Sequence, residues 1–489
     1  MQLLERLRQH ARDRPDAPAL CEVGADGSVT DTLSWRAYAQ AVDRVAWQLD
    51  QCTARGSVIG VQLANQLTYP VVYLAVLAAG RTVFPLHPAL TEYEVQEAAA
   101  KANADRVICE QALGLTRTTI APHVVRAWMQ DPINKGDRRK PSGTGAGSML
   151  LQSSGTTGMP KIAERSAGSI DAVARNVARA VGLDQQDQVI AAIPLCHSYG
   201  IENGLVGPLL AGACVYACPG FDPGVISGLW SSLDRVVVPA VPIMIDLLAS
   251  AEDLPLPGDR LRRVYSAGAA LPASVSDRFL ERFGKRVGQL YGATEIGSVT
   301  FGHADASALA PGCVGEAMDG VSIRVVDLDQ PAITLPPGEQ GQVAIRAPSM
   351  LDRYLGDEEL PIVAGHYLTG DLGTLGPDGA LSITGRIKAL IEVGGMKVNA
   401  MEVERVLAEH PGVNECVVVP VRITETLSRL TAFVLPVDPD APPPTASLRR
   451  HARGRLAAYK VPRAFEVVDQ LPRSSLGKVQ RRRLMETRA

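Results

Sequence analysis

Residues 153–161 read Ser-Ser-Gly-Thr-Thr-Gly-Met-Pro-Lys and directly follow an apolar run, Met149–Leu151, that is typical of a buried strand. Gly155 and Gly158 allow backbone N–H groups to approach a ligand closely, because glycine has no Cβ and reaches positive φ. Four hydroxyl groups add neutral donors and one lysine adds a positive charge: Ser153, Ser154, Thr156, Thr157 and Lys161. The stretch therefore predicts a loop that holds a polyphosphate.

The loop departs from the Walker pattern, which requires a lysine directly after the second glycine and a hydroxyl residue after that lysine. Here Met159 and Pro160 intervene, and Ile162 follows Lys161. A flexible surface loop is the alternative interpretation, because Gly/Ser/Thr clusters commonly form one. The preceding strand and the terminal lysine favour the phosphate-binding loop.

The composition is that of an ordinary globular protein. The chain has 489 residues, of which 46% are hydrophobic and 21% are charged, with a formal net charge of -3. The length predicts two to four domains, and the charge balance argues against nucleic acid or an anionic membrane as a partner. No apolar run reaches the ~18 residues of a membrane span, and the eight scattered cysteines form no Cys-x-x-Cys pair. We expect a cytoplasmic protein with reduced cysteines.

Helical and strand patterns alternate along the first two thirds of the chain, which predicts largely parallel sheets with helices on their faces. Strands are expected at 57–63, 83–86, 189–194, 235–241 and 261–266, and helices at 35–51, 69–79 and 167–181. Short strands dominate residues 312–383, which predicts a small β-rich layer. The fold class is therefore α/β, with a large domain over 1–387 and a small, mobile α+β domain over 388–489.

Five further segments carry chemical groups where strands end or turn. Three lie before residue 300: Pro194–Gly200, which holds a histidine, a serine and a tyrosine; Tyr265–Pro272, which is rich in small residues; and Gln289–Glu295, which combines an aromatic ring, a hydroxyl and a carboxylate. Two follow: Tyr367–Asp371, which ends in an acid, and Pro472–Lys478, which ends in a lysine. A carboxylate such as Glu295 suits Mg²⁺, which prefers oxygen ligands. Each segment alone is a weak signal.

In this order and at these spacings, the segments resemble the adenylate-forming (ANL) superfamily, which includes acyl- and aryl-CoA synthetases. The resemblance covers nearly the whole chain, and its most specific parts are Ser153–Lys161, Tyr291–Glu295, Thr369–Asp371 and Gly477–Lys478. It implies that a carboxylic acid attacks the α-phosphate of ATP to give an acyl-adenylate and pyrophosphate. A second nucleophile then displaces AMP.

The resemblance also implies roles for individual residues. Residues 153–161 would hold the β- and γ-phosphates, Tyr291 would stack on adenine beside Gly268, Ala269 and Ala270, and Asp371 and Arg386 would bind the ribose. The remaining implied contacts are Gly292 and Ile383 at the nucleotide, Thr294 at the α-phosphate, Glu295 at Mg²⁺, and Lys478 between the carboxylate and the α-phosphate. Lys388 would be the hinge of the small domain, with Gly394 and Gly395 lining the channel for the acceptor.

The acid pocket is expected to include His197, Ser198, Tyr199, Val238, Gly268 and Gly292. Relatives that activate α-amino acids usually carry an aspartate at the position of Ser198, so an α-amino acid is disfavoured, because its ammonium group would be buried unpaired. Small residues leave room for a planar ring and favour an aromatic or heteroaromatic acid. Glu202 is either a structural acid at the edge of the core, which we favour, or a group that binds a donor on the substrate.

The acceptor stays open between CoA, a free amine and a carrier-protein pantetheine, with CoA favoured. The basic run Arg481–Arg483 would suit a CoA phosphate, although a solvated helix start is the commoner explanation for such a run. Two other classes of function are considered. A kinase-like phosphotransferase would release ADP, and a non-catalytic binding protein would show no acid-dependent exchange.

Overall fold

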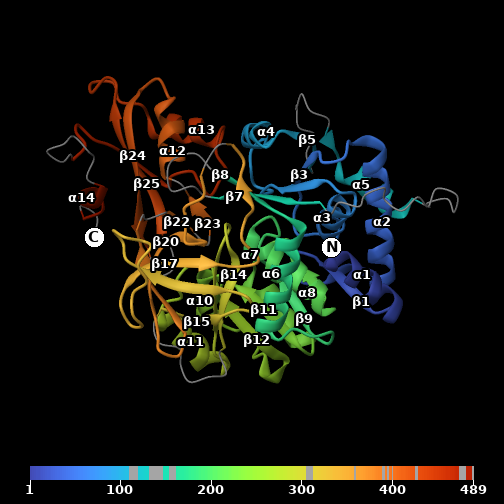
Figure 1. The fold of residues 1–489 in the computed structure, drawn as a ribbon. Helices are drawn as coiled ribbons and strands as arrows, with labels where there is room; N and C mark the ends of the chain where they lie inside the picture. Colours follow the sequence, from blue (N-terminus) through green and yellow to red (C-terminus); the bar gives the residue numbers. More distant parts are fainter. Residues whose placement is uncertain are drawn as a thin grey trace. The chain divides into compact units, whose positions relative to one another are not determined.

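The computed structural model describes residues 1–109, 119–131, 147–153, 161–303, 312–356, 359–387, 391–393, 396–398, 400–423, 428–472 and 481–486. Figure 1 shows its ribbon. The chain divides into two compact units. Unit 1 comprises residues 1–88, 99–152 and 162–387, and unit 2 comprises residues 89–98, 153–161 and 388–489. Among the described residues, no helix combines the length and apolar character that a membrane span requires.

The larger sheet of unit 1 is mixed and has 14 strands. Six neighbouring strands, β1-β10-β9-β11-β12-β13, are parallel; antiparallel strands extend them on both sides, with β2 beyond β1 and the remainder beyond β13. The parallel strands are Pro18–Val23 (β1), Cys214–Ala217 (β10), Gln188–Ala191 (β9), Val236–Ala240 (β11), Leu261–Ser266 (β12) and Gly288–Ala293 (β13). The antiparallel strands are Val29–Ser34 (β2), Gly297–Gly302 (β14), Cys313–Ala317 (β15), Leu381–Arg386 (β21), His366–Leu375 (β20), Gly341–Arg346 (β17), Ser322–Val326 (β16) and Ile362–Val363 (β19).

A second sheet of seven strands has the order β18-β8-β7-β4-β3-β5-β6. Its strands are Arg353–Tyr354 (β18), Lys161–Arg165 (β8), Met149–Ser153 (β7), Thr82–Pro85 (β4), Val58–Gln62 (β3), Ala104–Cys109 (β5) and Thr119–Ile120 (β6). The pairs β7-β4, β4-β3, β3-β5 and β5-β6 are parallel. The strand expected before the glycine-rich loop is therefore present as β7, and Met149, Leu150 and Leu151 are buried in it.

The helices between Gln2 and Phe283 agree with their sequence patterns. Residues 68–77 of α3 are buried on every side, as expected of a helix that is apolar all round. The side chains of Ser34 and Ser166 cap α2 and α6, and Gly182 ends α6 in the left-handed conformation with φ +68°. The helices are Gln2–Asp13 (α1), Trp35–Cys52 (α2), Thr68–Ala78 (α3), Glu92–Lys101 (α4), Pro122–Gln130 (α5), Ala167–Val181 (α6), Ser198–Ile201 (α7), Gly207–Ala211 (α8), Pro223–Ser232 (α9), Pro242–Ser250 (α10) and Ala273–Phe283 (α11).

Unit 2 holds the C-terminal elements, which are coloured orange to red in Figure 1. A three-stranded sheet, β24-β25-β26, and a two-stranded sheet, β22-β23, share an apolar core with α12 and α13. The elements are Ile391–Val393 (β22), Met396–Val398 (β23), Ala400–Ala408 (α12), Val413–Arg422 (β24), Ser428–Pro436 (β25), Thr445–Arg453 (α13), Ala464–Val467 (β26) and Arg481–Glu486 (α14). The predicted α/β class with a small α+β part is confirmed.

Candidate active site

Two residues predicted for the nucleotide lie in contact, although 80 positions separate them. The Tyr291 hydroxyl, on β13, donates a hydrogen bond to Oδ2 of Asp371, on β20, over 2.6 Å. Asp371 is also opposite Arg386 in the antiparallel pair β20-β21, so the backbones of the two predicted ribose residues are adjacent. The structure thus brings an aromatic ring and an acid together at one point of the large sheet.

Two of the predicted site residues are glycines whose conformation or packing excludes a side chain. Gly268 follows the end of β12 with φ +89°, a conformation that L residues rarely adopt. Gly292 lies next to Tyr291, where a Cβ would collide with the carbonyl group of Gly297. Both positions therefore require glycine for structural reasons. Val238, which was predicted for the acid pocket, is buried in the middle of β11.

Glu295 is oriented by a tyrosine that the sequence patterns did not reveal. The hydroxyl of Tyr354, on β18, donates to Oε1 of Glu295 over 3.2 Å and lies 2.9 Å from the hydroxyl of Tyr367. Burial and the nearby Glu295 charge raise the pKa of Tyr354 far above its ordinary value, so this hydroxyl stays protonated and remains a donor. The half-buried Glu295 carboxylate is a hard oxygen donor, a type of ligand that fits Mg²⁺.

A buried ion pair joins the segments that carry Thr294 and His197. Arg165, at the end of β8, donates from Nη1 to Oε1 of Glu202 over 2.7 Å, and their side chains are 0% and 2% exposed. Arg165 Nη2 donates to the carbonyl of Thr294 over 2.6 Å. Glu202 Oε2 accepts bonds from the backbone N–H and the hydroxyl of Ser298, over 2.8 and 2.6 Å. Both carboxylate oxygens of Glu202 are therefore occupied by protein donors, which supports its structural interpretation.

Arg165 was missing from the predicted site. Its guanidinium bridges a strand, the short π-helix Glu202–Val206 and the turn between β13 and β14. The partners lie 37 and 129 residues away in the chain, so no helical or strand periodicity connects them. The one sequence signal for Arg165 was the acid at position 202. A carboxylate there indicates that a cation or a hydrogen-bond donor contacts it.

The segment before His197 is held by Asn65, which lies in the loop after β3 of the seven-stranded sheet. Its amide nitrogen donates to the carbonyls of Ala191 and Ile193, over 3.1 and 2.9 Å, and its oxygen accepts from the N–H of Leu195 over 2.9 Å. The predicted strand 189–194 was too long, because β9 ends at Ala191 and these bonds to Asn65 replace the strand ladder. His197 then directly precedes α7.

Ser198 and Tyr199 form the first turn of α7. The Tyr199 hydroxyl donates to the carbonyl of Ala240 over 3.1 Å, which ties α7 to the end of β11. Burial raises the pKa of Tyr199 well above its ordinary value, so the phenol stays neutral. Tyr199 therefore offers an apolar ring face, with its polar end occupied.

Several predicted residues lie outside the described part of the chain: Ser154, Gly155, Thr156, Thr157, Gly158, Lys388, Gly394, Gly395 and Lys478. At the borders of the glycine-rich loop, Ser153 ends β7 and Lys161 begins β8. Ala269 and Ala270 follow Gly268 in a loop, and Ile383 lies on β21. The roles of these residues stay predictions.

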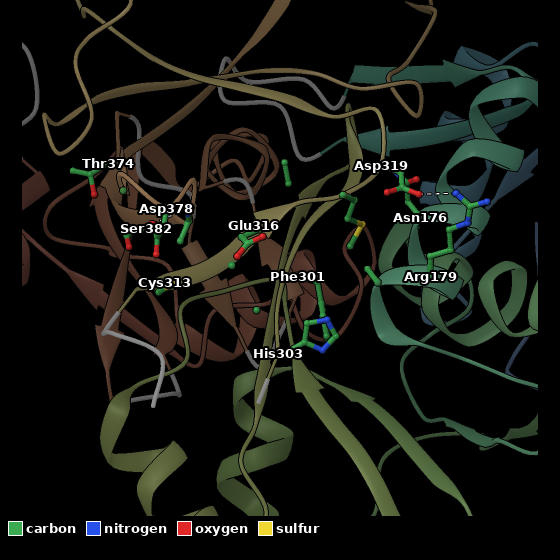
Figure 2. A pocket seen from close by; sticks show the side chains of 17 residues that line it. Asn176, Arg179, Phe301, His303, Cys313, Glu316, Asp319, Thr374, Asp378 and Ser382 are labelled. Carbon is green, nitrogen blue, oxygen red and sulfur yellow. Dashed lines mark hydrogen bonds and ion pairs between the residues drawn. The ribbon is translucent and has the colours of Figure 1, made fainter. Parts of the chain in front are cut away.

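A separate hollow of about 660 Å³ lies along β14, β15, β20 and β21 (Figure 2). Its lining includes Thr374 and Ser382, which face each other toward the hairpin end of β20 and β21, whereas Asp371 and Arg386 pair at the other end of the same strands. The exposed ion pair between Arg179 and Asp319, 2.6 Å long, lies at this hollow. The residues predicted to bind ATP or the acid are not among those that line it.

Two protein families match most of the chain. The family described as AMP-binding enzyme matches residues 7–355, and the family described as AMP-binding enzyme C-terminal domain matches residues 402–478. The chain belongs to the AMP-binding enzyme family. The prediction of an adenylate-forming acid ligase is confirmed.

Individual relatives are similar over most of the chain. The medium-chain fatty-acid–CoA ligase of Escherichia coli is 28% identical, with 97% of this chain and 88% of that protein covered. A malonyl-CoA ligase, solved as a ternary product complex with methylmalonyl-CoA and AMP, is 26% identical with a TM-score of 0.81 and covers 96% of this chain and 100% of that one. An amide bond synthetase from Marinactinospora thermotolerans shares the fold at 24% identity, with a TM-score of 0.83 and coverage of 100% and 99%.

Proposed function

We propose that the protein is an ATP-dependent acid–CoA ligase that activates an aromatic or heteroaromatic carboxylic acid. The observation that carries the proposal is the 2.6 Å hydrogen bond between Tyr291 and Asp371, which brings the expected adenine and ribose contacts to one place. It lies in a chain whose family binds AMP and whose relatives include CoA ligases.

In the first step, an oxygen of the acid carboxylate attacks the α-phosphorus of ATP, and the bond to the pyrophosphate oxygen breaks. The buried Arg165 holds the carbonyl of Thr294, which fixes the residue expected at the α-phosphate. Tyr354 orients the carboxylate of Glu295, the residue expected to hold Mg²⁺; when bound, that ion neutralises phosphate charge. Positioned donors of this kind stabilise the charge that develops in the transition state.

In the second step, a thiolate attacks the acyl carbonyl and displaces AMP. CoA is the proposed acceptor, because the fatty-acid and malonyl relatives are named CoA ligases. A free amine is the second candidate, because the amide bond synthetase shares the fold over the whole chain. A carrier-protein pantetheine is the third.

The proposed aromatic acid rests on Gly268 and Tyr199. A Cβ at Gly268 would meet only the side chain of Val241, at 3.7 Å, and the ring of Tyr199 offers an apolar face whose hydroxyl is already bonded to Ala240. A flat ring packs between such surfaces with few polar groups to desolvate. An aromatic acid differs from the acids that the names of the two ligase relatives give, which are aliphatic: a medium-chain fatty acid and malonate.

A panel of carboxylic acids tests the function and the choice of acceptor together. Each acid is incubated with ATP and Mg²⁺, and pyrophosphate release is measured without acceptor, with CoA and with simple amines. We expect acid-dependent release that CoA accelerates, with aromatic acids turned over faster than medium-chain fatty acids. Faster turnover of aliphatic acids would contradict the acid assignment, and acceleration by amines but not by CoA would select the amide-forming alternative.

A hinge at Lys388 predicts that the two steps respond differently to one substitution. Proline at this position fixes φ near −65°, so Lys388→Pro is expected to hinder a rotation between the two half-reactions. We expect adenylate formation, measured by ATP–pyrophosphate exchange, to be spared while thioester formation falls. Lys388→Ala serves as the control, because it removes the charge and leaves φ free. Equal loss of both activities in the proline variant would contradict a hinge at this residue.

A further inference from the structure

Three metal-ligating side chains converge at the junction of the two sheets of unit 1. The ligand nitrogens of His87 and His197 and the sulfur of Cys196 all lie within 4.8 Å of one another. His87 follows β4 of the seven-stranded sheet, whereas Cys196 and His197 follow β9 of the large sheet. The cluster therefore forms only when both sheets are folded. The spacing of the three residues in the sequence does not predict it.

The geometry is close to that of a transition-metal site. Zn²⁺ binds cysteine sulfur at about 2.3 Å and histidine nitrogen at about 2.0–2.1 Å, which places ligand atoms about 3.3–3.6 Å apart in a tetrahedron. The present separations need to shorten by no more than about 1.5 Å, which side-chain rotation supplies. The two imidazole rings are tilted by 38° with centroids 5.3 Å apart, so they are not stacked face to face.

The backbone on both sides of the cluster is held in place. Asn65 bonds the carbonyls of Ala191 and Ile193 and the N–H of Leu195, directly before Cys196. The buried Gln62 reaches the carbonyls of His87 and Pro88, over 3.5 and 3.4 Å. Ligands on rigid supports lose little freedom when an ion binds, which favours affinity.

We propose that His87, Cys196 and His197 form a binding site for a zinc-class transition metal ion. The donor set of two imidazoles and one thiolate suits Zn²⁺, Co²⁺ and Ni²⁺ rather than Mg²⁺ or Ca²⁺. Three protein ligands leave a fourth position open, as in sites that bind an exchangeable ligand. The thiol proton of Cys196 leaves to solvent when the Cys196 sulfur coordinates the ion.

Cobalt binding tests the site without any use of enzyme activity. The full-length protein is titrated with Co²⁺, and the near-ultraviolet charge-transfer band of a cobalt–thiolate bond is recorded. We expect one Co²⁺ per chain with this band, loss of the band in Cys196→Ser, and affinity lowered more than about tenfold in His87→Gln. The matched control is Cys218→Ser, because Cys218 is also a buried thiol of unit 1, with a pKa that burial raises to about 12, as it does that of Cys196.

The outcomes decide the proposal in both directions. Absence of the band in the unaltered protein, or its persistence in folded Cys196→Ser, would overturn the site. If circular dichroism shows that Cys196→Ser does not fold, unchanged cobalt affinity in His87→Gln would overturn it instead. A band lost in Cys218→Ser would also contradict the assignment, because that thiol lies outside the cluster.

A consequence for activity rests on the proposed function. An ion on His197 removes that imidazole from the acid pocket, so Zn²⁺ is expected to inhibit acid-dependent ATP–pyrophosphate exchange, and His87→Gln to raise the inhibitory concentration more than about tenfold. The cobalt titration is independent of this result. Cobalt binding without zinc inhibition would retain the metal site and contradict the role of His197, whereas absent exchange in every condition would contradict the proposed function alone.

Discussion

Replacing Lys478 by alanine is expected to lower acid-dependent ATP–pyrophosphate exchange by a factor of ~10²–10³, the typical cost of removing one preorganised transition-state donor. The proposed role of this lysine is to bridge the attacking carboxylate and the α-phosphate, where negative charge is most concentrated. Exchange is the suitable measurement, because it reports adenylate formation without the acceptor.

Two controls separate this effect from a general loss of charge or of fold. Lys285→Ala removes a lysine whose Nζ lies 3.7 Å from Oδ1 of Asp259, in an ion pair at the surface, and the exchange rate of this variant should stay near that of the parent enzyme. Lys478→Ala should retain ATP binding in equilibrium dialysis, since the other phosphate and nucleoside contacts remain. Exchange within tenfold of the parent rate would remove Lys478 from the proposed mechanism.

Breaking the buried pair between Arg165 and Glu202 is expected to destabilise the protein by about 3–5 kcal/mol, because either single substitution leaves an uncompensated buried group. Glu202→Gln keeps the shape of the side chain and removes the charge that faces Arg165. The free energy of unfolding of unit 1, measured by urea denaturation, is the direct readout. The exposed pair Arg179–Asp319 is the matched control, and Asp319→Asn should change stability by less than about 1 kcal/mol.

The same variant distinguishes the two interpretations of Glu202. Both of its carboxylate oxygens are bonded to Arg165 and Ser298, so the order of preferred acids should be unchanged in Glu202→Gln even though its stability and overall rate fall. A double variant, Arg165→Met with Glu202→Leu, should recover part of the lost stability, because no charge remains buried. A changed order of acids with unchanged stability would instead place Glu202 in the acid pocket.

Several helices and strands could be located from the sequence, because capping and turn residues mark where they begin and end. Helix α6 was predicted at Ala167–Val181 and occurs there, since Ser166 caps its start and Gly182 ends it. Strand β12 was likewise predicted at Leu261–Ser266, before the turn at Gly268. The end of β9 was misplaced by three residues, because the bonds that replace its ladder come from Asn65, in the loop after β3 of the other sheet.

The candidate site was predictable to the extent that it consists of contiguous motifs. Tyr291, Glu295 and Asp371 stand in short segments that resemble a known family, and the hydrogen bond between Tyr291 and Asp371 then follows from the fold. Arg165, Tyr354 and His87 could not be found in this way. Each acts through a partner on a distant strand or loop, and such pairs leave no periodic pattern in the chain.

The central claim is that ATP is cleaved at the α-phosphate to activate an acid for transfer to CoA. The most direct measurement is the balance of nucleotide products when the full-length protein is given ATP, Mg²⁺, CoA and its best acid from the panel. We predict AMP, pyrophosphate and an acyl thioester in equal amounts, with none of the three formed when the acid is omitted. Release of ADP and phosphate, or AMP formation independent of the acid, would contradict this account.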